Sequence, residues 1–157
     1  MAWWKRLFAR IWHNLAWQTG TWIWRKTARR WNSPRRRWAA SRIAKTLAFR
    51  RGDGAALIVA AGDARVDNAK FRAYFGERAR MLQGDEVLAR TGHAPGGVCP
   101  FAVRPGAQVY LDVSLKRFDT VYPAGGNAHS AVRLSLEELE RASQFCDWID
   151  VCGGYNP

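Results

Sequence analysis

The hydrophobic pattern of the chain changes near residue 38. In residues 3–15, apolar side chains recur at the three- and four-residue spacing of a helix, with basic side chains between them. This spacing predicts an amphipathic helix. From residue 43 onward, short apolar segments are separated by turns that contain glycine or proline. We therefore predict a helical N-terminal extension at residues 1–38, called the head below, and one folded domain at residues 39–157.

The folded domain is predicted to mix strands and helices. Strands are expected at residues 46–49, 57–61, 80–82, 109–112, 120–122, 131–134 and 148–151. Helices are expected at residues 67–75, 85–90 and 135–143. Asp67 can cap the first helix, and Ser135 with Glu138 forms an S-x-x-E capping box for the last. Because strands and helices do not alternate strictly, the pattern favours an α+β domain, a mixed β-sheet flanked by helices.

The distribution of charged residues changes close to the position at which the hydrophobic pattern changes. The formal net charge is +12, yet every acidic residue lies at or beyond Asp53. Before Asp53 stand 14 of the 25 lysines and arginines and eight of the nine tryptophans. The rest of the chain holds 11 cations against 13 acids and is nearly neutral. The basic, Trp-rich character therefore belongs to the head and the segment just after it.

Several interpretations of the head remain open. As a tRNA-binding arm, its cations would contact phosphates and its tryptophans would stack on bases. As a basic amphipathic helix it would lie on an anionic membrane. An acid-free, Arg-rich leader is also typical of organelle transit peptides, although so many tryptophans are not. Finally, this composition is what an out-of-frame reading of a GC-rich gene would produce.

The cysteines and the hydropathy indicate the compartment. Cys99, Cys146 and Cys152 make an odd count without a C-x-x-C pair, so we expect no disulfide framework and a reducing compartment. No run of about 18 apolar residues is present, so no spanning helix and no stable membrane partner are expected. We predict a cytoplasmic protein.

Five segments carry a family resemblance. Residues 42–49 read R-I-A-K-T-L-A-F, residues 60–67 A-A-G-D-A-R-V-D, and residues 91–101 T-G-H-A-P-G-G-V-C-P-F. Residues 111–115 (L-D-V-S-L) and 124–130 (A-G-G-N-A-H-S) follow in order. This order resembles the YbaK/ProX family of aminoacyl-tRNA deacylases, which includes YbaK/EbsC and the prolyl-tRNA synthetase-associated editing domain. Ala61 stands where the family usually has proline, and the family's acid-containing helix and strand before the lysine strand are not evident here.

The resemblance implies a fold, an activity and partners. It implies a mixed sheet with a pocket for the terminal adenosine and its esterified amino acid. The activity would be hydrolysis of that ester on mischarged tRNA carrying a small amino acid such as cysteine, alanine or serine. The chain would act in trans on tRNA, with prolyl-tRNA synthetase as a further candidate partner. No metal or organic cofactor is implied, and the sequence does not fix the oligomeric state.

The resemblance also nominates site residues. Lys45, followed by Thr46, would anchor a phosphate or carbonyl oxygen as a point charge. The glycine-rich loop would present backbone N–H donors, since glycine allows close approach to a ligand. Its residues are Gly96, Gly97, Val98, Cys99 and Pro100. Gly125, Ser130 and His129 would complete the polar lining, with His129 as a candidate acid–base group.

Other interpretations of the same residues are weaker. Cys99 is a candidate nucleophile with His93 nearby in sequence, but nothing in the sequence orients the pair. A zinc site built from His93 and the three cysteines matches no known ligand spacing. Two alternatives to a deacylase stay open. One is a non-catalytic RNA-binding or regulatory module with the same fold and a degraded pocket, and the other is a membrane-surface protein driven by the head.

Overall fold

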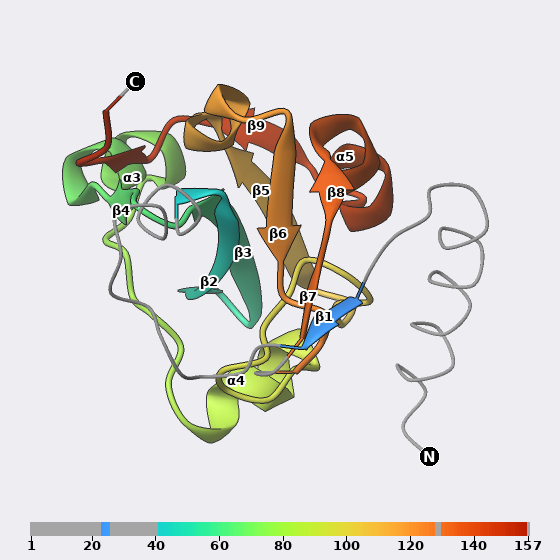
Figure 1. Cartoon of the computed structure of the whole chain (residues 1–157). Helices are drawn as coiled ribbons and strands as arrows, with labels where there is room; N and C mark the ends of the chain where they lie inside the picture. Colours follow the sequence, from blue (N-terminus) through green and yellow to red (C-terminus); the bar gives the residue numbers. More distant parts are fainter. Residues whose placement is uncertain (1–22, 26–40, 128–129, 157) are drawn as a thin grey trace, which may run out of the picture.

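The computed structural model describes residues 23–25, 41–127 and 130–156 of the chain (Figure 1). Of the head, these include only β1 (Ile23–Arg25), which is a short strand and not part of a helix. The helix predicted at residues 3–15 lies outside the described residues.

The centre of the fold is a mixed six-stranded sheet. Its strands are β2 (Ile43–Arg51), β3 (Gly54–Ala61), β5 (Ala107–Asp112), β6 (Thr120–Pro123), β8 (Leu134–Ser135) and β9 (Asp147–Ile149). In space their order is β8-β6-β2-β3-β5-β9. The pairs β2–β3 and β6–β8 are antiparallel, whereas β2–β6, β3–β5 and β5–β9 are parallel. The predicted hairpin is confirmed, because β2 and β3 meet at a turn in which Gly52 has a φ of 50°.

Three strand predictions need correction. Residues 80–82 form one bridge, Met81 to Phe49, and no strand. Two backbone bonds flank this bridge, from Arg50 N to Arg80 O and from Leu82 N to Ala48 O, and the burial of Leu82 explains the strand-like pattern.

The strand predicted at residues 131–134 is split because its two ends pair with different partners. β7 (Ser130–Val132) pairs with β1, and β8 pairs with β6. The closing strand, predicted at residues 148–151, ends earlier, at Ile149 in β9. The chain then forms β10 (Cys152–Gly153), which pairs with β4 (Arg65–Val66).

Helix positions follow the predicted capping signals. The helices are α3 (Asn68–Phe75), α4 (Asp85–Thr91), α5 (Leu136–Ser143) and the 3-10 helix η1 (Val113–Arg117). Asp67 Oδ1 accepts from the N–H groups of Ala69 and Lys70 at 2.8 and 3.0 Å, which confirms the first cap. The capping box of Ser135 and Glu138 is formed in both directions. Within the described part of the chain, no helix has the length and apolar character needed to cross a membrane.

Burial of β3 holds the sheet in place. Seven of its eight residues are buried, as expected for a strand that is covered on both faces. Helix α3 packs Phe71 against Phe49 of β2, with ring centroids 5.0 Å apart, and Phe75 against Tyr110 of β5 at 5.3 Å. In Figure 1, α3 and α5 lie toward one end of the sheet and α4 toward the other. The backbone of β2, which carries Lys45, is thereby fixed against a buried neighbour.

A matched pair of leucines tests this core. Leu139 on α5 is 0% exposed, whereas Leu88 on α4 is 47% exposed. We expect Leu139→Ala to lower the free energy of unfolding by about 2–5 kcal/mol, because it leaves a cavity. Leu88→Ala should change it by less than about 1 kcal/mol. Urea titration followed by circular dichroism measures both values, and similar losses in the two variants would contradict the packing described here.

Candidate functional site

A pocket of about 350 Å³ opens beside β2. Residues 43–48 of β2 form one wall. The remaining lining residues are Met81, Leu82 and Val87 near α4, Pro95, Gly96 and Val98 of the following loop, and Tyr122 and Ala124 at the end of β6. Its size is in the range of small-ligand sites. The structure therefore brings together four of the predicted site residues: Lys45, Thr46, Gly96 and Val98.

Lys45 is a partly buried cation in this wall. The β2–β3 register places it opposite Ala60, and its Nζ donates to Gly62 O at 3.3 Å and to Ala64 O. Burial lowers the pKa of Lys45 from its ordinary 10.5, while Cys152 and Asp63 act to raise it. An ammonium has three N–H donors. Since two of them are directed to carbonyls, the third is left for an oxygen atom of a ligand.

Next to Lys45, Thr46 also belongs to the pocket wall. Its Oγ1 is buried and has no hydrogen-bond partner among the described residues. A buried hydroxyl without a partner is unusual in a folded protein, and an ordered water would satisfy it.

The glycine-rich loop contributes in a different way from the one predicted. Gly96 and Val98 line the pocket, whereas Gly97, Cys99 and Pro100 are buried and are not part of its lining. The N–H of Gly97 donates to Ala94 O at 3.0 Å, so it stabilises the loop and is not presented to a ligand.

Gly97 also holds two loops together. A Cβ at this position would lie 2.9 Å from Asn127 Cα and 3.2 Å from Gly126 O. Only a residue without a side chain allows this approach. The loop that contains Gly125 is therefore packed directly on the loop that contains Gly97.

Cys99 and His93 meet, although nothing in the sequence orients them. Cys99 Sγ lies 3.6 Å from His93 Nε2, and His93 Nε2 lies 2.7 Å from Phe101 O. Since a carbonyl only accepts, Nε2 carries the proton in this arrangement. Burial raises the pKa of Cys99 to about 12 and lowers the pKa of His93. The pair is thus a neutral, buried thiol and imidazole, which argues against a nucleophilic cysteine.

The zinc site and the roles of His129 and Ser130 are the remaining predictions about this region. Across the residues that the structure describes, no three His, Cys, Asp or Glu side chains gather as a metal site would need. All three cysteines are free thiols. His129 lies outside the described residues, and Ser130 is described only as the first backbone position of β7. The roles of His129 and Ser130 in the polar lining therefore stay predictions.

A family profile named Aminoacyl-tRNA editing domain matches residues 29–142. The chain belongs to this editing-domain family. This membership confirms the resemblance to the YbaK/ProX proteins, and the match begins inside the head, ten residues before the predicted start of the domain.

Individual proteins similar to this editing domain agree with that membership. The uncharacterized protein YwhH of Bacillus subtilis (strain 168) is 58% identical over 113 residues, which are 71% of this chain and 72% of YwhH. A solved structure described as a candidate trans-editing enzyme for prolyl tRNA synthetase has a TM-score of 0.76 at 24% identity, covering 98% of this chain and 99% of that one. The structure of hypothetical protein APE2540 has a TM-score of 0.70 at 25% identity, covering 91% and 99%. These structures share the fold of the editing domain.

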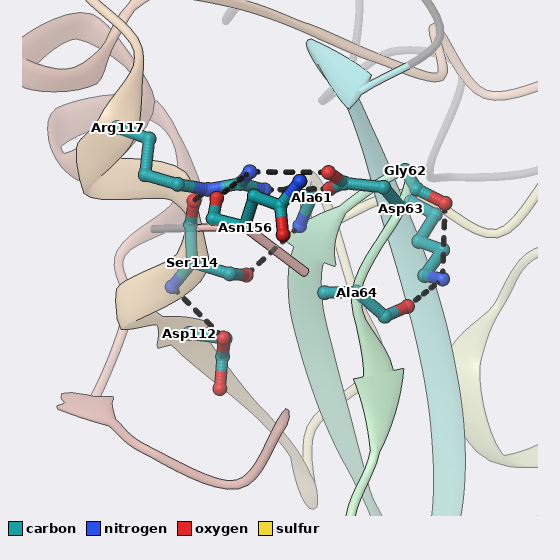
Figure 2. A network of polar contacts seen from close by, with 9 residues as sticks. Ala61, Gly62, Asp63, Ala64, Asp112, Ser114, Arg117 and Asn156 are labelled. Carbon is teal, nitrogen blue, oxygen red and sulfur yellow. Dashed lines mark hydrogen bonds and ion pairs between the residues drawn. The ribbon is translucent and has the colours of Figure 1, made fainter. Parts of the chain in front are cut away.

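Sequence reasoning missed two parts of the candidate site. The carbonyls that bond Lys45 belong to the segment 60–67, whose sequence contributes to the family resemblance but does not indicate this role. Met81 and Tyr122 also line the pocket, and no local signal marks them, because they reach it through long-range pairing. Asp63, which lies between Gly62 and Ala64, is bonded to Arg117, 54 residues later in the sequence (Figure 2).

The burial of the thiols leads to a labelling prediction. Cys146 is exposed, whereas Cys99 and Cys152 are buried, with pKa values raised to about 12 by that burial. Iodoacetamide reacts with thiolates. At pH 8 the native protein should therefore be alkylated at Cys146 and protected at the other two until it is unfolded. Mass spectrometry of peptides reports the sites, and labelling of native Cys99 as fast as Cys146 would restore the nucleophile hypothesis.

A second prediction concerns the contact between the two glycine loops. Gly97→Ala places a methyl group against Asn127, so we expect a loss of about 1–3 kcal/mol in stability. It should also shift the amide resonances of residues 95–98 and 124–127. Gly153→Ala is the matched control, because a Cβ there meets nothing within 4 Å. If both variants leave the loop resonances unchanged in a ¹⁵N-correlated spectrum, the loops are not packed as described.

Proposed function

We propose that the protein is a trans-acting deacylase that hydrolyses the ester of mischarged aminoacyl-tRNA carrying a small amino acid. The observation that carries the proposal is Lys45, a partly buried ammonium with an available donor in the wall of a pocket, in a chain of the aminoacyl-tRNA editing family. The likeness to a candidate trans-editing enzyme for prolyl tRNA synthetase supports action on tRNA in trans. We therefore expect tRNA as the partner, prolyl-tRNA synthetase as a candidate second partner, and a cytoplasmic location.

In the proposed reaction, water attacks the ester carbonyl carbon and the bond to the ribose oxygen breaks. The ribose oxygen takes up a proton, so the products are a free amino acid and an intact 3′ end of tRNA. Negative charge develops on the carbonyl oxygen in the transition state, and a fixed cation stabilises it. Lys45 has the charge and the remaining donor for this role. His129 or Ser130 would complete the polar lining, and Cys99 needs no part because its thiol is buried and protonated.

The pocket walls bear on the proposed substrate. Leu82, Val87 and Val98 make part of the lining apolar, close to Lys45. Such an apolar wall separates small side chains from one another only weakly. The proposed substrate class, alanine, serine and cysteine esters, rests on the resemblance to the YbaK/ProX family.

One observation favours the second candidate, a non-catalytic RNA-binding module. Lys45 is already bonded to two backbone carbonyls, as a purely structural lysine would be. In such a module the pocket would bind the end of an RNA without breaking a bond.

Lys45→Met tests the proposed function. The variant keeps most of the side-chain length and removes the charge, so it should lower kcat/KM for at least one small mischarged tRNA tenfold or more. Lys116→Met is the control, because Lys116 is exposed and lies over the ring of Trp148, 4.7 Å from its centroid. The measurement is release of labelled amino acid across a panel of mischarged tRNAs. An inactive wild type that still binds these tRNAs would favour the binding module.

The same assay has an expected pH dependence. The active form of Lys45 is the protonated one, and burial lowers its pKa below 10.5. As pH rises through that lowered pKa, the ammonium is lost and the rate difference between wild type and Lys45→Met should shrink. Spontaneous ester hydrolysis is subtracted at each pH. A difference that persists unchanged to pH 10.5 would show that the charge on Lys45 is not required.

A further inference from the structure

The turn that holds Lys45 is itself fixed from outside the pocket. Residues 62–64 connect β3 to β4, and the turn is closed by a bond from Ala64 N to Ala61 O at 3.0 Å. A second backbone bond joins Gly62 N to Ser41 O at 3.1 Å. The carbonyls of Gly62 and Ala64 are the two acceptors of the Lys45 ammonium. The direction of these carbonyls therefore decides where Nζ sits.

Arg117, the last residue of η1, binds this turn through the side chain of Asp63 (Figure 2). Its Nη1 and Nη2 donate to the two carboxylate oxygens of Asp63 at 3.0 and 2.5 Å. This is the bidentate geometry that an arginine can make and a lysine cannot. The Arg117 side chain is 18% exposed and the Asp63 side chain 37% exposed, so the pair is half-buried on the arginine side and only partly screened by solvent.

The guanidinium of Arg117 is held on its other sides as well. Nε donates to Ser114 O at 3.0 Å, and Nη1 also donates to Asn156 O at 2.8 Å. The rings of Phe118 and Tyr155 lie 4.7 and 4.4 Å from the guanidinium carbon. Arg117 is thus a rigid anchor for Asp63 and not a flexible surface side chain.

A second connection joins η1 to the same turn. Ser114 Oγ accepts from Ala61 N at 3.1 Å. Asp112 is fully buried, and it accepts from Ser114 N at 2.9 Å and from Val151 N at 3.0 Å. The turn, η1 and the C-terminal segment therefore form one polar network, which ends at the carbonyls facing Lys45.

We propose that Arg117 is a positioning residue for Lys45, acting through Asp63 and the carbonyls of Gly62 and Ala64; its role in turnover rests on the deacylase function proposed above. The bidentate bond orients the turn, and the turn aims the remaining N–H of Lys45 at the ligand. The positive charge of Arg117 also balances Asp63. Without it, an uncompensated carboxylate would draw the ammonium of Lys45 away from the pocket.

Two variants separate geometry from charge. Arg117→Gln leaves Asp63 uncompensated, so the pKa of Lys45 should rise. Asp63→Asn removes an anion that raises the pKa of Lys45, so this pKa should fall. Both variants release the turn and should lower kcat for deacylation at least fivefold, with KM for the aminoacyl-tRNA changed less than twofold. Arg141→Gln is the matched control, because Arg141 is exposed on α5 and pairs only with Glu137 among the described residues.

The experiment titrates Lys45 by NMR of ¹³Cε-labelled lysine in the full chain, with Lys45→Met to assign the signal, and measures deacylation in parallel. Opposite pKa shifts in the two variants, joined to a loss of kcat in both, are the expected result. Lower thermal stability without any change in the Lys45 titration or in kcat would overturn the proposal. Should Arg117→Gln not fold, Asp63→Asn decides, because it keeps the bonds of Arg117 to Ser114 and Asn156.

The readouts also separate this inference from the proposed function. If wild type hydrolyses no ester in the panel while the Lys45 titration shifts as stated, Arg117 positions Lys45 and the deacylase proposal fails. If wild type is active while titration and kcat are unaffected by either variant, the deacylase proposal stands and the positioning role fails.

Discussion

A partly buried ammonium needs oxygen acceptors, and the carbonyls of Gly62 and Ala64 provide them for Lys45. Much of the fold can be understood from this requirement. The hairpin of β2 and β3 sets Lys45 opposite Ala60, only two residues before the turn that bonds it. The burial of β3 fixes that register, since a slip of one residue would turn Lys45 to the other face of the sheet. The cation is held by backbone atoms, which cannot rotate away as a carboxylate side chain could, and which leave its charge unneutralised.

The sequence could predict the elements whose rules are local. The caps at Asp67 and Ser135, the β2–β3 turn and the short helix that begins at Asp85 all follow from residues within a few positions of one another. The strand predictions that were wrong concern elements whose positions depend on long-range pairing. The split at Arg133 arises because β7 and β8 pair with different strands, and the bridge at Met81 depends on Phe49, far earlier in the chain. Neither pairing leaves a mark on the local pattern of apolar residues.

The candidate site likewise contains residues that a sequence motif indicates and contacts that only the folded chain reveals. Lys45, Thr46, Gly96 and Val98 were nominated by the order of family motifs, and the structure gathers them around one pocket. The motif does not indicate which backbone groups can bind a ligand. The N–H of Gly97 donates to Ala94 O, and the absence of a side chain at Gly97 allows the close approach of Asn127. The bond between Asp63 and Arg117 spans 54 residues, so only the folded chain could reveal it. A glycine or an ion pair thus acquires its role from contacts that a motif does not record.

Burial decides which of the reactive-looking groups can do chemistry. Cys99 and His93 lie within 3.6 Å, as a nucleophile and its base would, yet the thiol remains protonated and the imidazole donates to Phe101 O. The described residues that line the pocket include Lys45, Thr46 and Tyr122 as polar side chains, and neither a carboxylate nor a histidine. A cation in such a wall can stabilise a developing oxyanion but cannot take a proton from water. For the proposed hydrolysis, we propose that the base is His129, which lies outside the described residues, or a group of the substrate itself, such as the neighbouring ribose hydroxyl.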